Sequence, residues 1–127
     1  MRAPLGLLLA GAFAALAASS GPAAAQGFLS MDELKTLITG NTVHFKAVDS
    51  GRTGRVYYDA KGEMLVDRDE GATYSGLWSV GTNGLLCINT SGEICGKVRK
   101  NADGTYTHMI REVPGYEWPK ITAGKSF

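Results

Sequence analysis

From Asn41 to Arg111 the sequence alternates apolar and polar residues with a period of two, in short stretches separated by glycine-containing turns. This period, with Gly, Asn and Asp at the breaks, is typical of half-buried β-strands. The connections are too short to cross over a sheet, so neighbouring strands must pair antiparallel. Residues 118–127, after a bend at Pro114-Gly115, can add a further strand. The strands predicted before it are 41–48, 53–60, 62–67, 73–80, 83–89, 93–100 and 104–111.

This meander predicts an all-β fold, either a curled antiparallel sheet or a small barrel of seven to eight strands. Closure into a barrel would remove the unpaired strand edges that invite aggregation. Alternation along each strand assigns one set of side chains to the interior. The residues of this set are Val43, Phe45, Val56, Tyr58, Met64, Val66, Tyr74, Trp78, Val80, Leu86, Ile88, Tyr106 and Ile110.

One short helix, at about 30–39, is predicted before the first strand. Ser30 is its expected N-cap, and Glu33 stands three positions later, where it completes a capping box. Gly40 ends the helix. A helix of this length is unstable alone, so we expect it to pack on the strands.

Residues 1–25 have the layout of a secretory signal peptide: a basic start, an apolar run at Leu5–Ala18 and an Ala23-x-Ala25 cleavage site. The apolar run is shorter than the roughly 20 residues of a membrane-spanning helix. We therefore expect cleavage after Ala25 and no stable membrane insertion afterwards. The mature chain, 26–127, would be a single β-domain in the periplasm or outside the cell.

The balance of basic and acidic residues argues against nucleic acid and anionic membranes as partners. The full chain has 13 Lys and Arg against 12 Asp and Glu, and loss of Arg2 with the leader makes the two counts equal. A neutral surface of mixed sign gives no electrostatic reason to bind nucleic acid or an anionic membrane.

Cys87 and Cys95 are the only cysteines. Exported proteins meet an oxidising environment, in which two cysteines usually pair. The segment between them predicts a hairpin with the three-residue loop 90–92, which places Ile88 opposite Ile94 and the two cysteines opposite each other. A disulfide here would stabilise the fold by roughly 2 to 3 kcal/mol. The spacing is not that of a redox C-x-x-C motif or of a zinc site.

The motif Gly76-Leu77-Trp78, followed by Leu86-Cys87 and Cys95, resembles a family of small secreted bacterial proteins, of alphaproteobacterial type, whose function is unknown. That resemblance implies a leader and a structural role for the cysteines, and it implies no catalytic residue.

The G-x-W motif is also loosely similar to that of lipocalin-like barrels, including periplasmic inhibitors of secreted metalloproteases. In those barrels it tends to lie on the first strand, whereas Trp78 lies mid-chain.

Catalytic chemistry is poorly supported. The two histidines, His44 and His108, have no nucleophile motif beside them, and both cysteines are expected to be oxidised. We therefore expect no enzyme activity, no cofactor and no metal site.

His108 alternates with Tyr106 and should point inward, where a core histidine bonded to a neighbour is the ordinary outcome. As a ligand-binding residue it is only a weak candidate.

Tyr116 and Trp118 are the stronger candidate binding residues. They lie in PGYEWP, a proline-flanked segment that we expect to be irregular and to form an exposed aromatic lip.

The sequence thus predicts a protein that acts by binding. It would be an interaction or accessory module, such as an inhibitor, for an unknown protein partner in the cell envelope. The alternative is a carrier of a small apolar ligand with a lipocalin-like cavity. The size of the inner side chains distinguishes the two, because large inner aromatics would fill the barrel.

Overall fold

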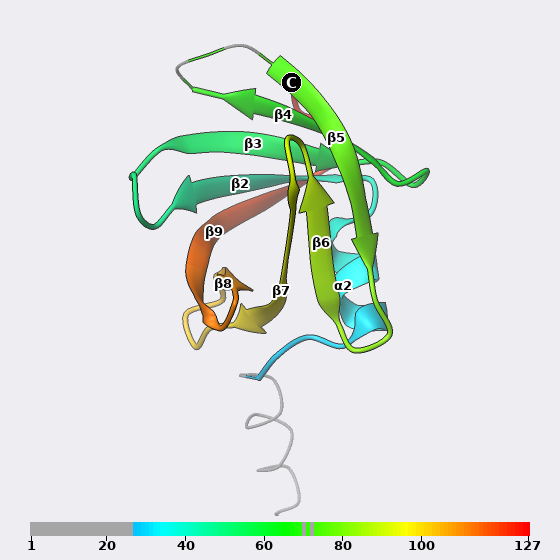
Figure 1. Cartoon of the computed structure of the whole chain (residues 1–127), viewed down its shortest axis with the longest axis vertical. Coiled ribbons are helices and arrows are strands. Elements are labelled where there is room, and N and C mark those ends of the chain that lie inside the picture. Colours follow the sequence, from blue (N-terminus) through cyan, green and yellow to red (C-terminus); the bar gives the residue numbers. More distant parts are fainter. Residues whose placement is uncertain (1–26, 70, 72) are drawn as a thin grey trace, which may run out of the picture.

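The computed structural model describes residues 27–69, 71 and 73–127. These residues form a closed antiparallel barrel in which the strands follow one another in chain order, and one helix precedes it (Figure 1). The predicted all-β barrel is confirmed, with eight strands. The predicted signal peptide lies outside the described residues. The elements are α2 (Met31–Ile38), β2 (Asn41–Ala47), β3 (Thr53–Tyr58), β4 (Glu63–Arg68), β5 (Thr73–Val80), β6 (Leu85–Asn89), β7 (Glu93–Lys100), β8 (Tyr106–Ile110) and β9 (Val113–Ala123).

Helix α2 covers the end of the barrel at which β2 begins and β5 ends, as Figure 1 shows. Its capping box is the one that the sequence predicts: the Glu33 amide donates to Ser30 Oγ, and the Ser30 amide donates to the Glu33 carboxylate. Leu34 and Ile38 are completely buried in the core. The helix is therefore a plug for one end of the barrel. Within the described part of the chain, no helix is long and apolar enough to cross a membrane.

Strand β9 begins earlier than predicted. The expected bend at Pro114-Gly115 is instead part of β9, where Pro114 pairs with Met109 and Tyr116 pairs with His108. Gly115 is left without a partner on β8, which makes it the extra residue of a β-bulge. Bulges are among the few places where a sheet tolerates proline, since the missing N–H is not needed there.

The core agrees with most of the predicted inward set. Twelve of its residues are buried or packed against the buried cluster, and Ile110 is the exception. Ile110 is the last residue of β8, and its side chain lies against the backbone of Gly115 at the bulge, outside the buried cluster. The core also contains residues that the inward set lacked, namely Leu34, Ile38, Val98 and Trp118.

Candidate ligand-binding site

A cavity of about 590 Å³ opens inside the barrel. Its mouth is formed by the β2–β3 turn, the end of β4 and the β6–β7 hairpin. In an up-and-down barrel these connections lie at the end opposite to the one where β2 begins, so the mouth faces away from α2. The volume is within the range of about 300 to 1,000 Å³ that small-molecule sites have. The protein is therefore shaped as a cup with one closed and one open end.

The wall of the cavity changes from apolar to charged between its interior and its mouth. Inside, it is made by aliphatic and aromatic side chains and by His108. At the mouth, the described residues include four exposed charged side chains of both signs. The charged residues are Asp49, Arg52, Arg68 and Glu93. The interior residues include Val43, Val56, Tyr58, Met64, Val66, Ile88, Ile94 and Trp118.

Strands β8 and β9 bring His108 together with Tyr116 and Trp118, the pair that the sequence analysis selected apart from it. The ring of His108 stacks on Tyr116 with centroids 6.1 Å apart, and its centroid lies 5.9 Å from that of Trp118. All three line the cavity. The predicted exposed lip is wrong: Trp118 is only 2% exposed and Tyr116 is half-buried, because PGYEWP is part of β9 and turns both rings inward.

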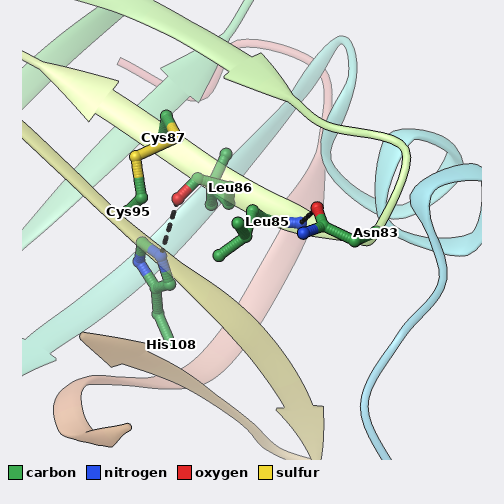
Figure 2. Close-up of a disulfide and its surroundings, with 6 residues drawn as sticks. All are labelled: Asn83, Leu85, Leu86, Cys87, Cys95 and His108. Atoms are coloured by element: carbon green, nitrogen blue, oxygen red, sulfur yellow. Dashed lines mark hydrogen bonds between the residues drawn. A yellow bond between two sulfur atoms is a disulfide. The ribbon is translucent and has the colours of Figure 1, made fainter. Parts of the chain in front are cut away.

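His108 is 1% exposed. Its Nε2–H donates to the carbonyl oxygen of Leu86 on β6, at 3.2 Å, and Figure 2 shows this bond beside the disulfide. Burial lowers the pKa of His108 to about 4, and the backbone carbonyls of Leu86 and Gly96 offset only part of that effect. The imidazole is therefore neutral at physiological pH. It serves as a bonded core histidine, which is the ordinary role that the sequence predicts for it.

The lowered pKa of His108 predicts that the fold loses stability in mild acid. Its folded pKa of about 4 lies below the usual value of 6.5, so between these values the unfolded chain binds the proton more readily. The stability that neutral His108 contributes is complete above pH 6.5 and is lost as the pH falls towards 4. We expect a decrease of about 2 kcal/mol between pH 7 and pH 5 in urea unfolding.

His108→Phe is the control for this pH dependence, since Phe keeps a ring against Tyr116 and cannot titrate. In this variant the decrease between pH 7 and pH 5 should be much smaller than in the wild type. A wild-type stability that stays constant over this range would contradict the prediction.

The phenol groups of the cavity are also perturbed. Burial raises the pKa of Tyr58, and the nearby phenol of Tyr116 raises it further. The pKa of Tyr116 is raised mainly by burial and then by Tyr74 and Asp49, while Arg68 acts in the opposite direction. Tyr58, Tyr74 and Tyr116 all line the cavity, so each brings a phenol to its largely apolar wall.

The disulfide lies on the outer surface of the hairpin β6–β7. Cys87 pairs with Cys95 in the predicted register, with Ile88 opposite Ile94, and their sulfur atoms are bonded (Figure 2). Because Leu86 and Ile88 point inward, Cys87 points away from the cavity. The carboxylate of Glu93 lies within 4.8 Å of both sulfurs, but the disulfide leaves no thiolate there to ligate a metal.

The sequence analysis missed the role of Tyr58, Tyr74, Arg52 and Arg68 in this cavity. It placed the two tyrosines in the core and gave the arginines no role. One signal was present: in a meander of this order the turns that follow the first, third and fifth strands all lie at one end. Combined with a helix at the other end, that rule would have located the mouth.

Comparison with known proteins gives no match: no family model, no curated protein and no solved structure matches this chain. The resemblance to the secreted bacterial family and the looser one to lipocalin-like barrels therefore stay predictions from sequence motifs.

Proposed function

We propose that this protein binds a small apolar ligand inside its barrel. The observation that carries the proposal is the cavity of about 590 Å³, which is closed by α2 at one end and open at the other. Sites for small molecules are concave, mostly apolar, and fitted with a few polar groups that fix the orientation of the ligand. The inner aromatics, which the sequence analysis took as a sign of a filled barrel, instead line the walls of this cavity.

A protein partner has fewer surfaces available than the sequence analysis expected. A partner could dock on free strand edges, on the helix or on the aromatic lip that the sequence predicted. The eight strands close on themselves, α2 buries Leu34 and Ile38, and Tyr116 and Trp118 face the cavity. Small-ligand binding, the alternative in the sequence analysis, is therefore the function that the geometry supports best.

We also propose that the mature protein works in the periplasm or outside the cell. The sequence of residues 1–25 supports export, and the disulfide between Cys87 and Cys95 is compatible with an oxidising compartment. A carrier in that location would hold an apolar molecule that water dissolves poorly.

Native mass spectrometry of the protein isolated from the cells that produce it tests both proposals. We expect the mass of a chain that begins at Gln26 and carries one disulfide, together with the added mass of a non-covalently bound small molecule. An intact leader with two free thiols would contradict export. A protein that carries no ligand and also fails the binding test below would contradict the carrier function.

Ile88→Trp is designed to fill the cavity, which Ile88 lines from β6. The wild type should bind the neutral apolar dye N-phenylnaphthylamine, with a rise in dye fluorescence. The variant should bind it at least about tenfold more weakly, a loss of about 1.4 kcal/mol or more. Leu77→Trp is the matched control, because Leu77 is 60% exposed on β5 and outside the cavity. Equal binding by the two variants would contradict a site inside the barrel.

A further inference from the structure

Two buried hydrogen-bonding side chains line the cavity without a partner among the described residues. They are the hydroxyl of Tyr58, whose side chain belongs to a residue 3% exposed, and the indole N–H of Trp118, in a residue 2% exposed. A polar group that is buried without a partner destabilises the fold, so native structures rarely keep one without a reason.

The other buried polar side chains of the described chain are satisfied. Thr42 Oγ1 donates to the Gly124 carbonyl at 2.7 Å, Thr107 Oγ1 accepts from Asn101 Nδ2 at 3.0 Å, and His108 donates to Leu86. Trp78 offers a direct comparison with Trp118. Its indole N–H donates to the Asp59 carbonyl at 3.0 Å, at the periphery of the core. The two residues whose polar groups are unpaired share one property, which is that both line the cavity.

We propose that the cavity selects a neutral apolar ligand whose inner part carries acceptor oxygen, such as a carbonyl, and that Tyr58 and Trp118 donate hydrogen bonds to it. This inference rests on the proposed function and specifies the chemical class of its ligand. An indole N–H can only donate, and a phenol at neutral pH donates readily. A pure hydrocarbon would leave both groups unpaired.

Among the described residues, every Asp, Glu, Lys or Arg that lines the cavity lies at the exposed mouth, where Arg52 and Arg68 are accompanied by Asp49 and Glu93. The interior therefore favours a neutral ligand. A carboxylate pushed to the level of Tyr58 would lose its hydration and gain no cation in return. A carbonyl or ether oxygen gives up less hydration and is well matched by neutral donors.

Three naphthalene probes, substituted at the same ring position, test the inference by isothermal titration calorimetry on the mature, disulfide-bonded protein. Methyl naphthyl ketone carries a carbonyl, ethylnaphthalene replaces it by a methylene, and naphthoate carries a charge. We expect the ketone to bind about 5- to 10-fold more tightly than ethylnaphthalene, the effect of one ordinary hydrogen bond. Naphthoate should bind more weakly than the ketone.

Variants assign the preference to its residues. Tyr58→Phe should reduce the ratio of ketone to ethylnaphthalene affinity towards one, and Trp118→Phe should also lower it, while ethylnaphthalene still binds. The ratio cancels changes in cavity shape that affect both probes. Tyr57→Phe is the matched control on the same strand, since Tyr57 is not among the residues of the cavity.

Each outcome decides between the proposals. If the ketone and ethylnaphthalene bind equally, or if Tyr58→Phe leaves the ratio unchanged, the acceptor inference is overturned and the cavity remains a ligand site. If naphthoate binds most tightly, the neutral class is overturned. If none of the probes binds, the proposed function fails together with this inference.

A second readout needs no ligand. Removing an unpaired buried hydroxyl leaves no orphaned group behind, so Tyr58→Phe should unfold at the same urea concentration as the wild type or at a higher one. A urea midpoint clearly below that of the wild type would show that the hydroxyl has an internal partner, and would overturn the inference.

Discussion

Replacing Gly96 by Ala is expected to destabilise the protein by more than about 3 kcal/mol, a large part of the 5 to 15 kcal/mol that holds a domain folded. A Cβ atom at Gly96 would collide with the carbonyl oxygen of Met109 and stand 2.5 Å from its carbonyl carbon. These are backbone atoms of the neighbouring strand, so no side-chain rotation can relieve the clash. The end of strand β8 around Met109 would have to move away from β7.

Urea unfolding and the soluble yield of the variant measure this effect. Gly71→Ala is the control, because a Cβ atom at Gly71 meets nothing within 4 Å and its φ is not in the left-handed region. That variant should stay within about 0.5 kcal/mol of the wild type. If Gly96→Ala unfolds at the same urea concentration as Gly71→Ala, the close approach of β8 to β7 is not a constraint on the fold.

Replacing Trp118 by Ala is expected to cost about 3 to 5 kcal/mol, the usual range for a buried Trp or Phe. Trp118 packs its ring against Tyr106, at 6.5 Å between centroids, and against His108 at 5.9 Å. Truncation removes these contacts and extends the existing cavity into the core. The surrounding strands are tied into a closed barrel, which limits how far they can collapse into the space.

The stability lost in Trp118→Ala distinguishes a residue that is buried in the cavity wall from one on an exposed loop. An exposed Trp on a loop would change stability by no more than about 0.5 kcal/mol when truncated. Trp118→Phe should cost less than half as much as Trp118→Ala, because most of the ring volume is kept. Thermal or urea unfolding of both variants tests this, and a stable Trp118→Ala protein would mean that the ring is not part of the core.

Pattern and spacing alone predicted most of the architecture. The period-two stretches, with glycine-containing turns between them, defined the first seven strands to within about two residues at each end, a usual uncertainty. The capping box at Ser30 and Glu33 located the helix. The symmetric segment between Cys87 and Cys95 set the register of its hairpin, since a two-residue period and a fixed loop length leave little freedom.

The last hairpin was missed because its turn lacks the usual residues. Arg111 and Glu112 have φ angles of 52° and 68°, a conformation that Asn-Gly or Asp-Gly normally supply in two-residue turns. Without that signal, and with Pro114 following, the segment was predicted to bend irregularly. Pairing with both β8 and β2 instead draws the whole of Val113–Ala123 into the sheet.

The sequence by itself determined the all-β fold, the strand order and the pairing of the cysteines, because each follows from local period, turn chemistry and short connections. Only the tertiary structure decided that Tyr58, His108, Tyr116 and Trp118 share one cavity and that the barrel is left hollow at one end. Those facts depend on barrel closure, on the bulge at Gly115 and on how far large side chains from distant strands reach across the interior. Alternation says which face a side chain takes, but the volume that remains between facing walls is set by all eight strands and the helix together.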